Sequence, residues 1–170
     1  TTNSFQQMGQ ELRTQLKEAV SHCYDPTVKT AAFLSGGLDS SSVTGMLSEV
    51  SQTTAEAYSI GFSAEGYDEL EFARITATHF GVKLNEYYVT PEDVVNALPI
   101  IAASYDEPFG NSSALPAYFC AKVAAENGVQ RLLAGDGGDE LFAGNERYAK
   151  QGIFETYGKI PSGLRKAIIE

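Results

Sequence analysis

The chain has 170 residues, of which 43% are hydrophobic and 20% are charged, and this composition fits one globular domain with a buried core. Twelve Lys and Arg residues stand against 22 Asp and Glu residues, which gives a formal net charge of −10. Because binding to a nucleic-acid backbone relies on Lys and Arg to neutralise phosphates, this balance disfavours nucleic-acid partners.

The sequence also argues against a membrane span and a secretory signal. No apolar run approaches the length of a span, and the N-terminus lacks the pattern of a signal peptide. Cys23 and Cys120 lie far apart, and two buried free thiols in a reducing cytosol are the simplest interpretation, which predicts a cytoplasmic protein. The chain starts at Thr1 and ends at Glu170 inside a predicted helix, so we expect it to be a piece of a longer protein.

Hydrophobic periodicity predicts an alternation of helices and strands. In chain order, the predicted elements are a helix at 5–20, a strand at 30–35, a helix at 40–50, a strand at 56–62, a helix at 67–81, a strand at 82–90, helices at 92–105 and 113–128, and a strand at 129–135. Residues 106–113 and 136–144 are predicted loops, and the chain from Asn145 onward is predicted to be helical, with a turn at 161–163.

Glycines and prolines mark where several of these elements begin and end. Asp68 is a plausible N-cap and Gly81 a plausible stop for one helix, and Pro91 suits the first turn of the next. Pro99 falls inside that next helix and is expected to kink or shorten it.

Strand alternates with helix four times, which predicts an α/β fold: a parallel twisted sheet with right-handed crossovers and helices on both faces. Ligands of such sheets lie outside the carboxyl ends of the strands. Two glycine-rich loops are predicted at that edge, at residues 35–41 after the first strand and 135–139 after the fourth.

The first loop reads "SGGLDSS" and has the composition of an anion site. Gly36 and Gly37 lack a Cβ atom, so the backbone can approach a ligand closely. The loop opens a helix, whose free N–H groups and dipole favour a negative charge. Ser35, Ser40 and Ser41 add hydroxyl donors, so the loop is predicted to bind phosphate groups.

Asp39 is the unexpected residue of this loop, because a carboxylate repels phosphate. It is explained if Asp39 binds a Mg²⁺ ion that bridges to the phosphate oxygens; the alternative is a tight turn with Asp39 as the N-cap. No Lys or Arg lies between Thr30 and Thr54, so the loop lacks the lysine of a Walker A motif and suits a pyrophosphate that leaves as one unit.

The first loop resembles the pyrophosphate loop of the N-type ATP pyrophosphatases, which cleave ATP between the α- and β-phosphates. The second loop, "LLAGDGGDELFAGNERY" at 132–148, resembles the motif of the asparagine synthetase domain, which β-lactam synthetase shares. The segments 58–90 and 105–119 also resemble that family, so the likeness runs from about residue 12 to residue 148. It implies the PP-loop fold of the adenine nucleotide alpha hydrolase class.

This resemblance implies a role for each matching position. Contacts with the nucleotide and its pyrophosphate fall to Leu34, Ser35, Gly36, Gly37, Ser40, Ser41, Ile60, Ala134 and Gly135. The resemblance implies that Asp39 and Asp139 bind Mg²⁺ and that Asp136 takes part in forming the acyl-adenylate. Two positions depart from the family pattern, because Asp136 stands where Glu is frequent and Ala134 where other members have Ser.

The implied activity is that of an ATP-dependent ligase. A carboxylate, aspartate in the type enzyme, is adenylylated with release of pyrophosphate, and ammonia derived from glutamine then gives the amide, asparagine, and AMP. The family's N-terminal glutaminase domain and C-terminal helical part are absent from this chain, which we interpret as the N-terminal part of the ATP-binding domain over residues 1–170. The family's catalytic lysine should follow Glu170, and a homodimer is compatible with the resemblance.

Three other functions stay open at this point. A tRNA thiolase would share the first loop and could use Cys23 and Cys120 as its thiol pair, although the net charge and the second loop argue against it. A related ligase could act on another carboxylate, and a non-catalytic domain could only bind adenine nucleotides.

Several acidic and polar residues also have a purely structural interpretation. Asp139 and Glu140 would suit the N-terminus of a helix, and Asp68 and Glu69 are better explained as a cap and a first-turn charge than as ligands. Residues 111–113 could line an amino-acid pocket or form a surface turn.

Overall fold

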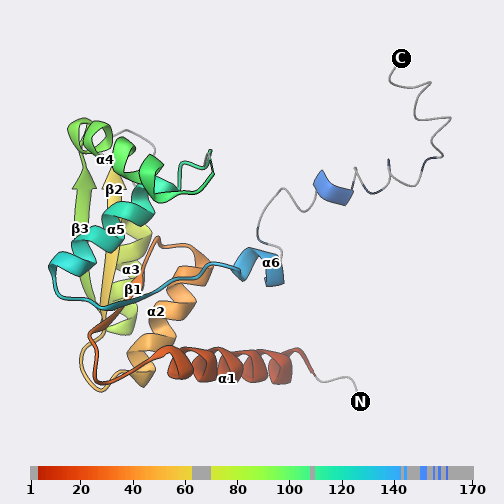
Figure 1. Ribbon diagram of the computed structural model, residues 1–170. Coiled ribbons are helices and arrows are strands. Elements are labelled where there is room, and N and C mark those ends of the chain that lie inside the picture. Colours follow the sequence, from red (N-terminus) through yellow and green to blue (C-terminus); the bar gives the residue numbers. More distant parts are fainter. Residues whose placement is uncertain are drawn as a thin grey trace. The chain divides into compact units, whose positions relative to one another are not determined.

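The computed structural model describes residues 4–62, 70–107, 110–142, 144, 150–152, 155, 157 and 160 (Figure 1). The chain divides into two compact units, Thr1–Gly135 and Asp136–Glu170, and each is described by itself. The expected N-cap Asp68, with Glu69 and the turn at 161–163, lies outside the described residues.

The first unit contains a four-stranded sheet in which all strands run parallel. Its order is β3-β2-β1-β4, so the first and fourth strands along the chain are neighbours. The strands are β1 (Thr30–Phe33), β2 (Glu56–Phe62), β3 (Lys83–Val89) and β4 (Arg131–Leu133). The predicted parallel α/β sheet is confirmed, and β2 has the predicted bounds.

Five helices belong to the first unit and a short one to the second, in which the described residues 150–152, 155 and 157 are also helical. They are α1 (Phe5–Cys23), α2 (Leu38–Val50), α3 (Leu70–Phe80), α4 (Pro91–Ser104), α5 (Ala114–Glu126) and α6 (Gly138–Phe142). In the part of the chain that the structure describes, none of them is long and apolar enough to cross a membrane.

Two of these helices differ from the prediction. Helix α6 occupies a segment that was predicted as loop. The two adjacent glycines at 137–138 favour a loop in the sequence, and a helix of only five residues is too short to show a hydrophobic period. Helix α4 continues past Pro99 to Ser104, so Pro99 does not shorten it, and the alternative of a kink stays a prediction. Pro99 and Val95 both lie on the exposed side of α4, where water can bind the Val95 carbonyl that loses its N–H donor.

Helices cover both faces of the sheet, as predicted (Figure 1). On one face, Ala32 and Ala57 pack against residues of α1, α2 and α3. On the other face, Ala31 and Tyr58 pack against α5, and α4 joins α5 over β2 and β3. This alternation along β1 and β2 is the two-residue period of a strand that is buried on both sides.

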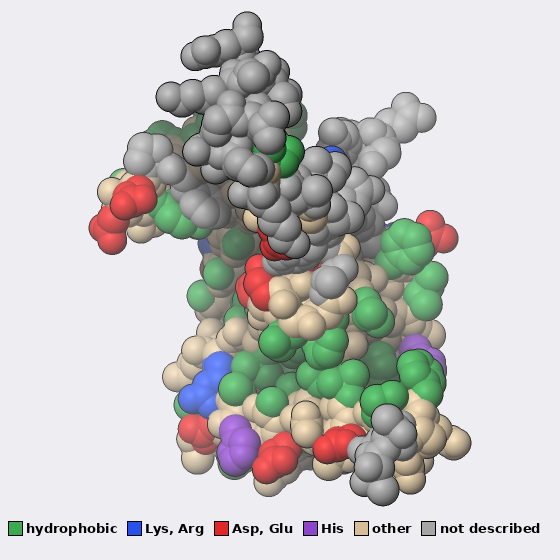
Figure 2. Space-filling view, turned by 90° about the vertical axis from the view of Figure 1, so that its right-hand side faces the viewer, with side chains coloured by type: hydrophobic (Ala, Val, Ile, Leu, Met, Phe, Trp, Pro, Cys, Tyr) green, Lys and Arg blue, Asp and Glu red, His purple; other side chains and the backbone are tan. Residues whose placement is uncertain are grey.

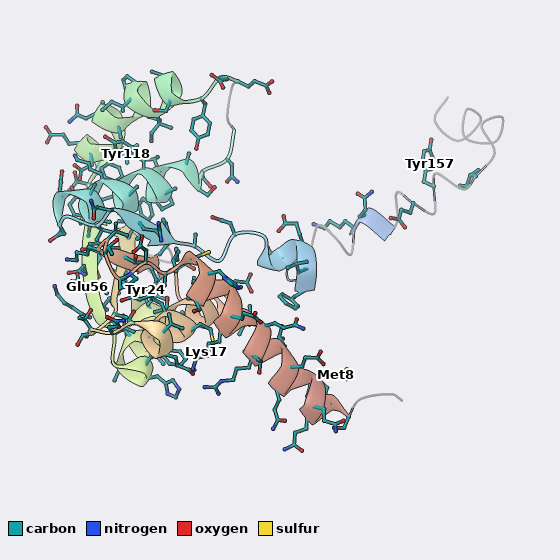
Figure 3. All side chains as sticks on the ribbon, turned by 60° about the horizontal axis from the view of Figure 1, so that its bottom comes forward. Met8, Lys17, Tyr24, Glu56, Tyr118 and Tyr157 are labelled. Atoms are coloured by element: carbon teal, nitrogen blue, oxygen red, sulfur yellow. The ribbon has the colours of Figure 1, made fainter. Side chains whose placement is uncertain are left out.

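Helix α1 is amphipathic, but only its second half is covered. Val20 is buried and Leu16 packs against the core, whereas Phe5 and Met8 are 89% and 50% exposed. Figure 3 shows the end of α1 that carries Met8 extending beyond the helices behind it, while Lys17 lies nearer the sheet. Lys17 forms an ion pair of 2.9 Å with Glu49 of α2, so charge as well as apolar packing holds the second half.

The surface of the described residues agrees with the acidic composition. Figure 2 shows hydrophobic side chains gathered in the middle of one face, with acidic side chains along its lower edge. Ion pairs link several basic side chains to carboxylates, among them Arg74 with Glu86 at 2.6 Å. Charges that are paired in this way offer little attraction to a nucleic-acid backbone.

The two cysteines lie in different environments. Cys120 of α5 is fully buried, its Sγ donates to the Tyr58 carbonyl at 3.5 Å, and burial raises the pKa of this thiol to about 12. Cys23 is exposed at the end of α1, so the expectation of two buried thiols is wrong for Cys23. The buried Cys120, with its raised pKa, does not suit the reactive thiol pair of a thiolase.

We therefore predict that iodoacetamide at pH 8 alkylates Cys23 within minutes and leaves Cys120 unmodified. A thiol with a pKa of about 12 is ionised at pH 8 in roughly one molecule in ten thousand, and burial also blocks the reagent. Peptide mass spectrometry before and after denaturation would measure this. Equal labelling of both cysteines in the folded protein would contradict the packing of α5.

Candidate functional site

The first glycine loop connects the carboxyl end of β1 with the N-terminus of α2. Leu34 extends the ladder, because its N–H donates to the Tyr58 carbonyl at 2.9 Å. The chain then turns at Gly36, which has a φ of +88°. A Cβ atom at Gly36 would lie 2.6 Å from the Cβ of Phe72 and 2.9 Å from the backbone N of Ala73. Glycine is thus required for conformation and for the packing of α3 on the loop.

The hydroxyl groups of the loop are connected to one another. Ser40 is 7% exposed, and its Oγ accepts from the Ser35 N–H at 3.2 Å and lies 2.9 Å from the Ser35 Oγ. The same Oγ donates to the Gly37 carbonyl at 3.2 Å. The turn from strand to helix is therefore held by the side chain of the first serine inside α2.

Contacts from α2 to α3 and along α2 hold the start of this helix. The Ser41 Oγ lies 3.0 Å from the Thr76 Oγ1 of α3. Thr44, which is fully buried, donates from its Oγ1 to the Ser40 carbonyl at 2.7 Å. The sequence analysis missed Thr44 and Thr76. The four-residue spacing from Ser40 could have indicated Thr44, but nothing in the sequence joins Thr76 to the loop.

Asp39 is not the N-cap of α2. The cap is Gly37, which offers no side-chain hydrogen bond, and Asp39 is the second residue of the helix. Its half-buried carboxylate has no hydrogen-bond or ion-pair partner among the described residues. The first N–H groups of α2 thus have no side-chain cap, which leaves the backbone donors that an anion site uses. The structural alternative for Asp39 is wrong.

Gly135, the first residue of the second glycine loop, lies against the first loop within the first unit. A Cβ atom on Gly135 would lie 2.7 Å from the backbone N of Ser40 and 2.9 Å from the Cβ of Asp39. This close approach follows from the sheet, because β4 pairs with β1 and both strands end at this edge. The prediction that the two loops lie together at the carboxyl edge is confirmed up to Gly135.

The side chains expected to contact the nucleoside lie on opposite faces of the sheet. Leu34 is fully buried with the helices α1 to α3, and its N–H donates to the Tyr58 carbonyl. Ile60 is half-buried and packs toward α4 and α5. Ala134 is exposed just before Gly135. These nucleotide contacts stay predictions.

The remaining acidic candidates belong to the second unit. Asp136 is exposed, and Asp139 and Glu140 lie in the first turn of α6, where negative charge favours the helix dipole. Asp39 and Asp139 fall in different units, so their shared metal site stays a prediction. Among the residues that the structure describes, no group of three or more His, Cys, Asp or Glu side chains could hold a metal ion.

Residues 111–113 form a turn, in line with their structural interpretation. The Asn111 side chain accepts from the Ser113 N–H at 3.0 Å, and Ser113 is the N-cap of α5. All three residues are exposed. An amino-acid pocket at this place stays a prediction.

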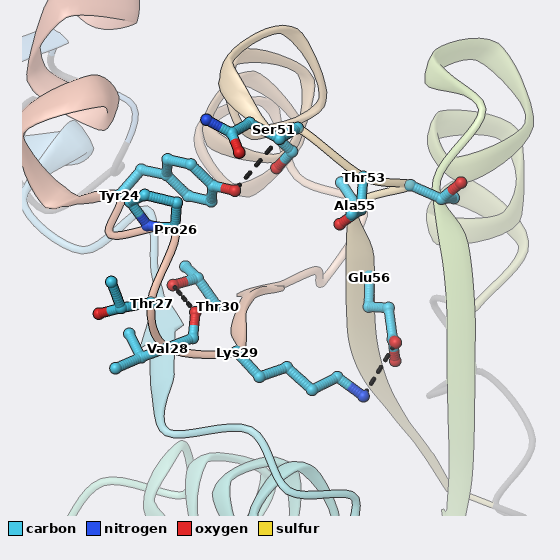
Figure 4. A pocket seen from close by; sticks show the side chains of 12 residues that line it. Tyr24, Pro26, Thr27, Val28, Lys29, Thr30, Ser51, Thr53, Ala55 and Glu56 are labelled. Carbon is cyan, nitrogen blue, oxygen red and sulfur yellow. Dashed lines mark hydrogen bonds and ion pairs between the residues drawn. The ribbon is translucent and has the colours of Figure 1, made fainter.

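A pocket of about 220 Å³ lies at the opposite edge of the sheet, where β1 and β2 begin (Figure 4). The ion pair between Lys29 and Glu56, 2.9 Å long, lies on its wall, and Asn85 also donates to Glu56 at 3.2 Å. Burial alone would raise the pKa of Glu56, but the hydrogen bonds from Lys29 and Asn85 outweigh it and lower this pKa. Figure 3 places Glu56 at this edge near Tyr24, so the pocket is separate from the glycine loops.

The sheet and its loops define a class of fold. A solved structure of the NH3-dependent NAD synthetase from Campylobacter jejuni is similar, with a TM-score of 0.52 and 12% sequence identity. The likeness covers 78% of this chain and 58% of that one. The chain thus has the PP-loop fold of which this synthetase is a structural neighbour.

The sequence comparisons give the family. The family model described as asparagine synthase matches residues 11–168, so the chain belongs to the asparagine synthase family. It is 33% identical to "Asparagine synthetase [glutamine-hydrolyzing] 1" of Bacillus subtilis over 94% of this chain. It is 34% identical to a putative asparagine synthetase of Methanocaldococcus jannaschii over 92% of this chain. The chain spans 25% and 30% of the length of these two relatives.

Proposed function

We propose that this chain supplies the nucleotide site of an ATP-dependent ligase that forms amides. In the proposed reaction a substrate carboxylate attacks the α-phosphorus of ATP, pyrophosphate leaves, and ammonia displaces AMP to give the amide. The observation that carries this proposal is the first loop: an uncapped helix N-terminus with Gly36 and Gly37 before it and the backbone of Gly135 against it.

The shape and composition of this loop support pyrophosphate as the leaving group. The donors available there are backbone N–H groups and hydroxyls, which can spread along the oxygens of a pyrophosphate. A γ-phosphoryl transfer site normally has a lysine that reaches the β- and γ-phosphates. No Lys or Arg is present between Thr30 and Thr54, so cleavage at the α-phosphorus fits this loop better.

Mg²⁺ is part of the proposal, with Asp39 and Asp139 as its protein ligands. The fit rests on Asp39, whose carboxylate lies beside the loop without a partner among the described residues and offers the oxygen ligands that Mg²⁺ prefers. When bound, Mg²⁺ would neutralise negative charge on the phosphate oxygens. Asp136 is the proposed residue for the adenylylation step, next to Gly135 in the sequence.

Aspartate is the proposed carboxylate, and asparagine the product. The names of the two relatives support this choice, and the words "glutamine-hydrolyzing" in them support ammonia from glutamine and a glutaminase domain in the full-length protein. A related ligase that acts on another carboxylate has the same loops and the same first step.

We expect the full-length protein with ATP, Mg²⁺, ammonia and aspartate to form AMP and pyrophosphate in equal amounts. Chromatography of [α-³²P]ATP products measures AMP directly, and a parallel reaction without a carboxylate measures background hydrolysis. If aspartate gives no AMP above that background, the assay is repeated with other amino-acid carboxylates. ADP and orthophosphate as the main products would contradict the proposed cleavage, and binding of ATP without turnover of any carboxylate would indicate a nucleotide-binding domain.

A further inference from the structure

Ser40 differs from the other serines of the loop in burial. Its side chain is 7% exposed, whereas Ser35 is exposed and Ser41 is half-buried. A ligand that arrives from solvent therefore meets Ser35 before it meets Ser40. The resemblance to the family implies the same phosphate contact for all three serines, whereas in the structure they differ in exposure to solvent.

The hydrogen bonds of Ser40 engage its only proton inside the loop. A hydroxyl has one proton to donate and two lone pairs that accept. The Ser40 Oγ accepts from the Ser35 N–H at 3.2 Å, and its proton lies between the Gly37 carbonyl at 3.2 Å and the Ser35 Oγ at 2.9 Å. Phosphate oxygens need donors, and either partner keeps this proton within the loop.

The backbone of Ser40 is fixed from two further directions. The buried Thr44 donates to its carbonyl at 2.7 Å, and Gly135 of the second loop packs against its N atom. A shift of Ser40 would therefore move the turn at residues 35–37 and the contact between the two loops together. Ser40 therefore connects the turn of the first loop with Gly135, which also lies against Asp39.

We propose that Ser40 is a positioning residue, which holds the first loop in its binding shape before the nucleotide arrives and does not itself contact the phosphates. What the loop binds rests on the proposed function, but the shape of the free loop does not. Direct contact with phosphate falls to the exposed Ser35 and to the backbone N–H groups at the start of α2.

This role predicts a specific kinetic pattern. Without the Ser40 hydroxyl the free loop spends part of its time in other conformations, so the apparent affinity falls by the fraction that remains competent. Once ATP is bound the loop has its proper shape, and kcat stays close to that of the wild type. A direct ligand of the departing pyrophosphate would instead lower kcat, because charge on that group grows in the transition state.

The test uses Ser40→Ala in the full-length protein, with Ser42→Ala as a matched control. Ser42 lies on the same helix, and its Oγ donates to the Leu38 carbonyl at 2.8 Å without touching the turn. Hydrogen exchange of a peptide covering residues 33–41, measured without nucleotide, shows how often the amides of the free loop lose their hydrogen bonds. Binding of ATP and steady-state kinetics report affinity and kcat. Ser40→Cys, which keeps a γ atom but replaces the hydroxyl with a weak hydrogen-bonding thiol, replaces Ser40→Ala if circular dichroism shows that the alanine variant does not fold.

We expect Ser40→Ala to speed exchange of the Ser35 and Gly37 amides about tenfold and to weaken ATP binding about tenfold, with kcat within about twofold. Ser42→Ala should leave all three values unchanged. Unchanged exchange in Ser40→Ala together with a fall in kcat would overturn the proposal, because Ser40 would then act as a direct ligand. If the proposed function is wrong, the wild type forms no AMP, yet the exchange of the free loop still decides the role of Ser40.

Discussion

Replacing Asp39 with asparagine is expected to lower the rate of AMP formation at least about a thousandfold in the full-length protein, with little change in stability. A metal ion that neutralises phosphate charge contributes several kcal/mol to the transition state, and each 1.4 kcal/mol is about a factor of ten. Asparagine keeps the size of the side chain but removes an anionic ligand of the proposed Mg²⁺. The loss should be partly offset by raising the Mg²⁺ concentration.

Stability should change little because the Asp39 carboxylate has no partner among the described residues and is only half-buried. The charge in the first turn of α2 is worth a few tenths of a kcal/mol to the helix dipole. Urea unfolding of Asp39→Asn measures this, and Glu49→Gln is the matched control. Glu49 lies on the same helix and pairs with Lys17 and Arg13, away from the loop.

The two variants should separate stability from activity. Glu49→Gln is expected to lose a small amount of stability, because exposed ion pairs contribute little, and to keep normal AMP formation. Asp39→Asn should keep its stability and lose AMP formation. A destabilised Asp39→Asn with normal nucleotide binding would mean that Asp39 serves the helix and not the metal.

The sequence predicts the centre of the sheet well, because β1 and β2 are mostly buried on both faces. The run "EAYSIGF" marks β2 at the observed bounds, and the glycines after β1 and β4 mark the loops. The predicted strand at 129–135 was too long, since β4 ends at Leu133. The length of β4 is set by its pairing with residues 30–32 of β1. The sequence of β4 alone does not show how many residues pair.

The candidate site was predicted less completely than the sheet. The motif "SGGLDSS" identifies the residues of the loop, but not which hydroxyl faces solvent. That distinction depends on segments far from the loop in sequence, because Gly135 lies against Ser40 and Thr76 of α3 lies 3.0 Å from the Ser41 Oγ. The position of Cys23 was missed for a related reason, because residue type gives only an average tendency to be buried.

The second large effect is expected for Gly135→Ala, which should weaken ATP binding about ten- to a hundredfold. The added methyl group would lie 2.7 Å from the Ser40 N, 2.8 Å from the Asp39 carbonyl carbon and 2.9 Å from the Asp39 Cβ. Most of these atoms are backbone, which cannot rotate away as a flexible side chain would. Overpacking of this kind costs about 1–3 kcal/mol, and relief requires one of the two loops to move.

Gly128→Ala is the matched control for this variant. Gly128 follows α5 with a φ of +77°, and a Cβ atom there would contact nothing within 4 Å. The alanine therefore costs about 1 kcal/mol of backbone strain and does not change the site. Equal losses of stability in the two variants would allow their ATP affinities to be compared directly.

The comparison tests whether the contact between the loops is needed for binding. If Gly128→Ala binds ATP normally and Gly135→Ala does not, the loss comes from the displaced loops and not from lower stability. If Gly135→Ala also binds ATP normally, the start of α2 tolerates a side chain between the loops. Gly135 would then be a consequence of how β4 ends beside β1, and the nucleotide site would have to lie on the first loop alone.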